Sequence, residues 1–279
     1  PPPYLAAHLS SLLLLLLRRA PKVAAKVAVP ESVLKKRKRA EDAKEGRIVN
    51  RIIRWTDQGI EYEADPRQSE KLVEQMGLAG SNSAATPGQK VTTEQLTEET
   101  PLEQFKHKVF RGVAARANYL SADRPDIQYS AKEICRWMAK PSTGGVLATK
   151  RLVRYLEGRR RVIFKYPWQE ALRVDVYSDT DWAGCPRTRK STSGGCLMLG
   201  GHLLKSWSTT QSQISLSSGG ASFYGVVRAA GIGLGFKSLL ADLGVQLPPR
   251  FWTDSTATMV ICGRQGLGKL RHVDTQCLW

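Results

Sequence analysis

The chain has 279 residues, of which 42% are hydrophobic and 24% are charged, so it has the ordinary composition of globular protein and room for two modest domains. Its net charge of +17 is not ordinary and predicts nucleic acid as a partner. Five cysteines without paired C-x-x-C spacing argue against zinc and disulfide frameworks. We therefore expect an intracellular protein, nuclear or cytoplasmic. No small-molecule ligand is evident, and the sequence leaves the oligomeric state open.

Residues 1–46 are predicted to be a basic, low-complexity segment without stable structure. The leucine-rich run from Leu12 to Leu17 is too short to span a bilayer and has no basic residue ahead of it, so we expect no membrane partner and no secretory signal. The basic run from Lys35 to Arg39 fits a nuclear address or a solvated linker. Because the sequence does not start with Met, we expect a fragment or an incomplete gene model.

Residues 47–160 are predicted to form a mostly helical region. It opens with strands at 51–55 and 59–62, joined by a turn, and a helix that starts at Asp65 and Pro66 and stops at Gly77. Residues 79–100 have little to bury and predict a loop or disorder. Apolar residues at helical spacing then predict three helices. Their stripes are Phe105, Val109, Val113, Ala117 and Leu120; Ile127, Ala131, Ile134, Cys135 and Met138; and Leu147, Leu152, Val153 and Leu156.

Residues 161–279 change to a strand pattern. Strands are expected at 162–166, 174–178, 195–199 and 203–207, followed by a helix from about 222 to 243. A short strand should then lead to Asp254, and a short helix should follow Ser255. In the second of these strands Asp175, Tyr177 and Asp179 alternate with Val174, Val176 and Ser178, which is typical of a strand with two different faces.

Several separate blocks of this region resemble the ribonuclease H domain of copia-type retrotransposon polyproteins. The resemblance extends from about Arg173 to Trp279. Its blocks are YSDTDWAG at 177–184, RKSTSGG at 189–195, KSWS at 205–208, Ser217-Ser218, WTDS at 252–255 and RHVD at 271–274. Upstream, YLSADRPDI at 119–127 and the segment 150–158 resemble the end of the same family's reverse transcriptase.

The resemblance implies a fold and a division of the chain. It implies a ribonuclease H-like mixed sheet with flanking helices at residues 161–279, with the last strand and helix missing. It also implies that residues 47–160 are the thumb or connection region of a reverse transcriptase. No polymerase palm is expected, because nothing before Arg47 resembles one.

In this family, hydrolysis of an RNA–DNA hybrid uses two Mg²⁺ ions that are held by four carboxylates. The resemblance assigns the first acid to Asp179 and the third to Asp254. The helix glutamate should lie in the block after Ser218, where this chain has Gly220 and Ser222 instead. The fourth acid is not reached. We therefore expect an inactive remnant that binds Mg²⁺ weakly or not at all. Two alternatives stay open: an active nuclease that recruits Asp181 or Asp274, and a nucleic-acid-binding module without catalysis.

Basic residues in the same region are candidates for contact with a hybrid or duplex. A tryptophan close to them is a candidate for stacking, and a place in the core is the alternative for it. The candidates are Arg187, Arg189, Lys190, Lys205 and Trp207.

Overall fold

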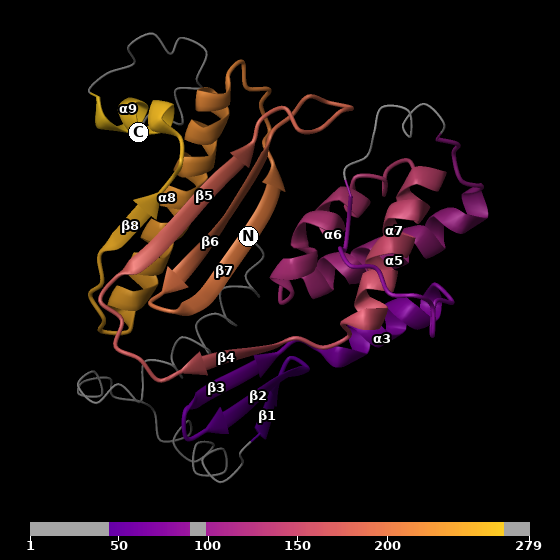
Figure 1. Cartoon of the computed structure of the whole chain (residues 1–279), viewed down its shortest axis with the longest axis horizontal. Coiled ribbons are helices and arrows are strands. Elements are labelled where there is room, and N and C mark those ends of the chain that lie inside the picture. Colours follow the sequence, from indigo (N-terminus) through magenta and orange to yellow (C-terminus); the bar gives the residue numbers. More distant parts are fainter. Residues whose placement is uncertain (1–44, 90–98, 265–279) are drawn as a thin grey trace. The chain divides into compact units, whose positions relative to one another are not determined.

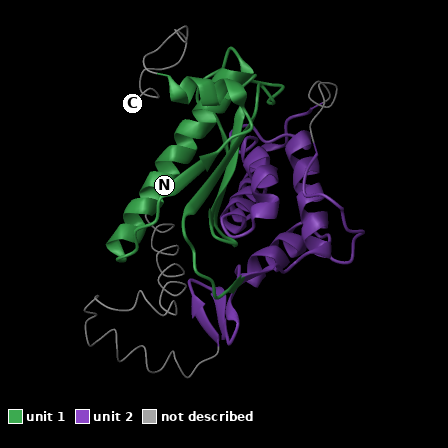
Figure 2. Ribbon diagram, turned by 60° about the vertical axis from the view of Figure 1, so that its left-hand side comes forward, with its two compact units in different colours: residues 1–39, 166–279 green, residues 40–165 purple. Residues whose placement is uncertain are grey.

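The computed structural model describes residues 45–89 and 99–264, and the chain divides into two compact units (Figures 1 and 2). The division falls between Lys165 and Tyr166. We call residues 45–89 and 99–165 the N-terminal unit and residues 166–264 the C-terminal unit. The predicted domain boundary was at residues 160 and 161. The run at Lys35 to Arg39, Asp274 and most of the predicted 1–46 segment lie outside the described residues.

The N-terminal unit contains a four-stranded sheet with the order β1-β2-β3-β4. The predicted hairpin is confirmed as β2 (Arg51–Thr56) and β3 (Gly59–Glu63), and β1 (Glu45–Ile48) pairs antiparallel with β2. The strand expected at 162–166 is β4 (Ile163–Pro167), and it joins this sheet rather than the later one. Its periodicity predicted a strand, but periodicity does not select the partner.

Helices α3 (Pro66–Gln75), α5 (Gln104–Ser121), α6 (Gln128–Cys135) and α7 (Thr143–Gly158) pack around one core, and η1 (Pro125–Ile127) is a short 3-10 turn before α6. The predicted cap is confirmed, since the Asp65 side chain accepts from Arg67 N at 3.2 Å. The core includes Leu72, Val113, Leu120, Ile134, Leu152 and Leu156.

Part of the predicted helical stripe is wrong. Phe105, Val109 and Leu147 are exposed, and Phe110 and Ala114 are buried in the same helix as the first two. The core-facing side of α5 is therefore rotated by about one residue in its first turns. Helical spacing fits both sets of residues, so the sequence pattern did not separate them.

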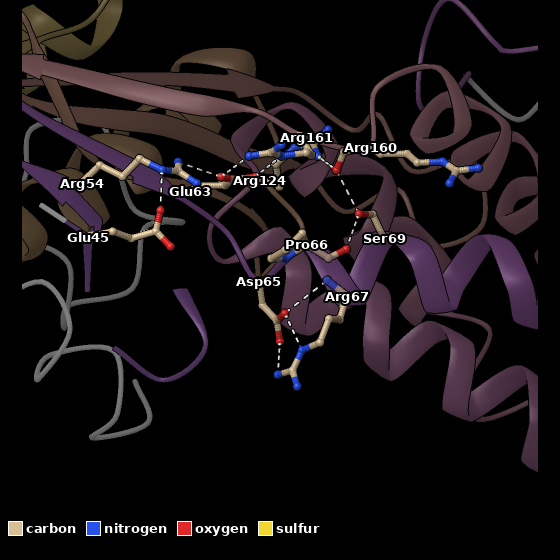
Figure 3. Close-up of polar contacts among 10 residues, drawn as sticks. All are labelled: Glu45, Arg54, Glu63, Asp65, Pro66, Arg67, Ser69, Arg124, Arg160 and Arg161. Carbon is tan, nitrogen blue, oxygen red and sulfur yellow. Dashed lines mark hydrogen bonds and ion pairs between the residues drawn. The ribbon is translucent and has the colours of Figure 1, made fainter. Parts of the chain in front are cut away.

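Ion pairs join the strands of this sheet to the segment that precedes β4 (Figure 3). Glu63 is buried and accepts from Arg161 Nη2 at 2.8 Å and from Arg54 Nη1 at 3.0 Å. The hydrogen bonds from Arg161, together with those from Arg54, outweigh burial and hold the pKa of the Glu63 carboxyl below its ordinary value. Glu63 thus connects the end of β3 to the segment that leads into β4.

Arg124 fixes the same segment from the helical side (Figure 3). Its guanidinium binds both carboxylate oxygens of Asp126, at 2.9 and 2.7 Å, and donates to the carbonyls of Arg159 and Arg160 at 3.0 and 3.3 Å. Ser69 Oγ also donates to the Arg160 carbonyl, at 2.9 Å. These bonds satisfy the carbonyls of the two residues that follow α7.

The C-terminal unit is built on a four-stranded sheet with the order β7-β6-β5-β8. β5 (Val174–Asp181), β6 (Thr192–Leu199) and β7 (His202–Thr210) are antiparallel neighbours, and β8 (Pro249–Trp252) pairs parallel with β5. The parallel pairing needs a crossover, which α8 (Ser218–Asp242) provides. The short helix α9 (Thr256–Gly263) follows β8. The fold of this unit is mixed α/β, as predicted.

Helix α8 lies along one face of this sheet (Figure 1), and glycines permit its close approach. A Cβ on Gly225 would lie 2.4 Å from Thr180 Oγ1, and a Cβ on Gly233 would lie 2.7 Å from the Phe251 ring. A Cβ on Gly231 or Gly235 of the same helix would meet no atom within 4 Å. Within residues 45–89 and 99–264, every helix is too short or too polar to cross a bilayer.

Candidate functional site

Strand β5 carries Asp179 on the sheet face that α8 leaves uncovered. Val176, Ser178 and Thr180 lie against α8, because a Cβ on Gly225 or Gly233 would meet their side chains within 3.1 Å. Side chains alternate along a strand, so Asp179 and Asp181 belong to the opposite face. Asp179 is exposed, and its Oδ1 accepts from the backbone N of Thr180 at 2.7 Å.

The structure places Asp254 at the same end of the sheet as Asp179. Tyr177 pairs with Trp252 in the parallel register of β5 and β8. Each aspartate follows two residues after one member of this pair, and both are exposed. β8 ends at Trp252, so the strand leads to Asp254 as predicted. Carboxylates near the carboxyl ends of adjacent parallel strands can approach a common ligand.

The first turn of α8 provides neutral groups where the resemblance implies a glutamate. Ser217 caps the helix by accepting from Gly220 N at 3.1 Å, and Ser222 is half-buried one turn before Gly225. Thr258 Oγ1 on α9 donates to the Gly219 carbonyl at 3.3 Å, which ties α9 to this turn. The turn is well ordered by these bonds, but its side chains carry no charge.

A pair of Mg²⁺ ions requires several hard anionic oxygens around one point. Among residues 45–89 and 99–264, no group of three His, Cys, Asp or Glu side chains is arranged to hold a metal ion. Asp181 continues β5 and shares the face of Asp179, because the strand pairs regularly up to Thr192. β5 ends at Asp181, and the chain turns at Trp182 and Ala183. The other alternative ligand, Asp274, is outside the described residues. The described residues do not fit a two-magnesium site.

The loop between β5 and β6 carries three of the predicted nucleic-acid contacts. Arg187 and Arg189 are exposed, and Lys190 is half-buried. Two backbone hydrogen bonds close this loop. Arg189 N donates to the Cys185 carbonyl at 2.8 Å, and Cys185 N donates to the Lys190 carbonyl at 3.2 Å. Arg189 has a φ of 55°, which is unusual for a residue other than glycine. The role of this loop in binding stays a prediction.

Lys205 and Trp207 lie on the face that α8 covers. Trp207 pairs with Gly195 on β6 and is only 5% exposed, so its ring cannot stack on a base without leaving the core. The core alternative for Trp207 is therefore favoured. Lys205 is half-buried, and burial, together with the nearby charge of Arg228, lowers its pKa below the ordinary lysine value. The predicted stacking of Trp207 on a base is therefore replaced by a place in the core. A contact between Lys205 and nucleic acid would have a desolvation cost.

The sequence did not reveal a cluster around Asp175. Asp175 Oδ1 accepts from Arg250 Nε at 2.7 Å and from Trp252 Nε1 at 2.9 Å. Burial alone would raise the pKa of this carboxyl, but the bonds from Trp252 and Arg250 hold it below its ordinary value. The alternation on β5 placed Asp175 and Tyr177 on one face. Only the pairing of β5 with β8 brings Arg250 and Trp252 beside them.

Known proteins resemble this chain in sequence. It is 29% identical over 167 residues to the retrovirus-related Pol polyprotein from transposon RE1 of Arabidopsis thaliana, a match to 59% of the chain and 11% of the polyprotein. It is 27% identical over 205 residues to the corresponding polyprotein from transposon RE2, a match to 72% of the chain and 14% of that polyprotein. An uncharacterised mitochondrial protein of the same plant is 36% identical over 110 residues, which are 39% of this chain and 45% of that protein. No family model matches the chain.

Two of these relatives are polyproteins of transposable elements. The chain is similar to retrovirus-related Pol polyproteins, and the predicted resemblance to retrotransposon Pol is confirmed. It spans 11% and 14% of the lengths of the two Pol polyproteins.

Proposed function

We propose that the C-terminal unit is a ribonuclease H-like remnant of retrotransposon Pol that does not sustain hydrolysis of RNA–DNA hybrids. Three antiparallel strands, a helix, a parallel strand and a helix follow each other in the order that the ribonuclease H resemblance implies. The central strand β5 presents Asp179, and β8 leads to Asp254. Both positions match acids of the copia-type pattern.

One observation carries the proposed loss of activity. The first turn of α8 has Gly220 and Ser222 at the two positions where the copia-type block has glutamates. A serine hydroxyl is a poor substitute for a carboxylate on Mg²⁺, and glycine has no side chain to offer. The ions would polarise the scissile phosphate and activate water, and their placement depends on that missing ligand. Asp179 and Asp254 alone supply too little negative charge.

For the N-terminal unit we propose descent from the thumb or connection region of the reverse transcriptase. The blocks that resemble that region lie at the end of α5, in η1 and in α7. Asp123 and Asp126 are engaged in structural bonds, with Arg51 Nε donating to Asp123 at 2.8 Å and Arg124 binding Asp126. These aspartates therefore support the fold, and we assign no polymerase chemistry to them.

The proposed function is tested with purified protein, Mg²⁺ and an end-labelled RNA–DNA hybrid, with Asp179→Asn as the matched variant. We expect no cleavage by the wild type above the background of the variant. Magnesium-dependent cleavage that Asp179→Asn abolishes would overturn the proposal.

A second candidate is a nucleic-acid-binding module without catalysis. The exposed arginines of the β5–β6 loop, Arg187 and Arg189, favour it, as does the net charge of +17. In the same assay this candidate predicts hybrid binding that weakens steeply as salt is raised, without cleavage.

A further inference from the structure

Two aromatic side chains lie next to each other on the uncovered face of the C-terminal sheet. Tyr177 on β5 and Trp252 on β8 are register partners, and their ring planes are parallel within 5° with centroids 6.0 Å apart. Tyr177 is 42% exposed and Trp252 is 41% exposed, although large aromatic side chains are usually more deeply buried. We call this pair the Tyr177–Trp252 platform.

Polar contacts hold the platform in one orientation. The indole Nε1 of Trp252 donates to Asp175 Oδ1 at 2.9 Å, and Arg250 Nε donates to the same oxygen at 2.7 Å. The Arg250 guanidinium also lies 4.2 Å from the centroid of the Trp252 ring. Because the Trp252 ring is already fixed, a ligand that stacks on it loses little side-chain entropy.

The charges near the platform are unevenly distributed along β5. At the start of the strand, Arg173 and Arg250 both pair with Asp175, at 3.4 and 2.7 Å, which leaves one positive charge in excess. Both arginine side chains keep about half of their surface exposed. At the other end, Asp179 and Asp181 are exposed on the same face. An anionic ligand is therefore favoured over the start of β5 and disfavoured over its end.

We propose that the Tyr177–Trp252 platform binds single-stranded nucleic acid, with a base stacked on the rings and phosphates directed to Arg173 and Arg250. Bases of a single strand expose their faces, whereas those of a duplex are already stacked on each other. Aromatic rings beside basic side chains are the common means of binding single strands without sequence preference. This inference goes beyond the proposed function and needs neither metal nor hydrolysis, so the two fail separately.

The test measures fluorescence anisotropy of a labelled oligothymidine of about 12 nucleotides with the whole chain in EDTA. We expect Trp252→Leu and Tyr177→Ile each to weaken binding about tenfold or more, and Trp252→Phe and Tyr177→Phe to stay within about twofold. Trp182→Leu is the matched control, because Trp182 is 48% exposed but its indole donates to the Ser215 carbonyl away from this pair. Circular dichroism of each variant verifies folding.

The uneven charge gives a second test with an almost isosteric change. Asp179→Asn removes a repulsive charge from the far end of the face, so it should tighten binding of the oligonucleotide a few-fold. Equal affinity of wild type, Trp252→Leu and Trp182→Leu would overturn the proposal. So would a concentration-dependent dimer that buries the platform and excludes the oligonucleotide, since the occupant would then be a second copy of the chain.

Discussion

Arg124→Met should lower the free energy of unfolding of the N-terminal unit by about 3 kcal/mol, the lower end of the cost of removing one partner of a buried ion pair, because Asp126 is 28% exposed. The Arg124 side chain is 1% exposed, and its guanidinium donates hydrogen bonds to Asp126 and to the carbonyls of Arg159 and Arg160. Methionine fills similar space but cannot donate to any of these acceptors, of which Figure 3 draws the one on Arg160. Urea titration followed by far-UV circular dichroism measures the change.

The control for this prediction is Arg136→Met. Arg136 pairs with Glu133 at 3.3 Å within one turn of chain, and both side chains are more accessible than Arg124. Such a pair contributes about 0–1 kcal/mol, so the control should stay close to the wild type. Equal losses in the two variants would contradict a special role for Arg124.

Gly195→Ala should destabilise the C-terminal unit by about 3 kcal/mol, the upper part of the range for overpacking. A Cβ at Gly195 would lie 2.1 Å from Trp207 Cζ2 and 2.4 Å from the backbone carbonyl oxygen of Tyr177. The carbonyl cannot retreat without disturbing the β5–β6 ladder. Thermal unfolding of the variant, monitored by near-UV circular dichroism, reports the loss.

The neighbouring Gly194→Ala is a matched control for the register of the sheet. A Cβ there has its nearest neighbours at 3.9 Å, which is an ordinary contact. The control should be neutral or slightly stabilising, because glycine weakens a strand by about 0.5–1 kcal/mol relative to alanine. A one-residue slip of β6 would exchange the two faces and reverse the two results.

Local signals in the sequence predicted much of the fold. The Asp65–Pro66 start of α3, the β2–β3 hairpin and the helix after Ser255 depend on residues within a few positions of each other, and all three are confirmed. Chemistry of this kind acts within one turn, so it can be read without knowing the rest of the molecule.

Contacts between distant segments were less predictable. The pairing of β4 with the first sheet and the bond from Arg250 to Asp175 join residues that no local pattern relates, the latter 75 positions apart. Trp207 could be assigned to the core only when Gly195 was found opposite it. For the candidate site, the resemblance selected Asp179 and Asp254, and the parallel register of β5 and β8 places them at one end of the sheet. Their role as metal ligands stays a prediction.

The proposed loss of nuclease activity depends on a shortage of carboxylates around Asp179. Anomalous diffraction from crystals of this chain soaked in Mn²⁺, used in place of Mg²⁺, shows most directly whether a pair of ions binds there. We predict no pair of ions beside Asp179 and Asp254, because Gly220 and Ser222 provide no anionic ligand. Two manganese ions about 4 Å apart and bridged by Asp179 would contradict the account.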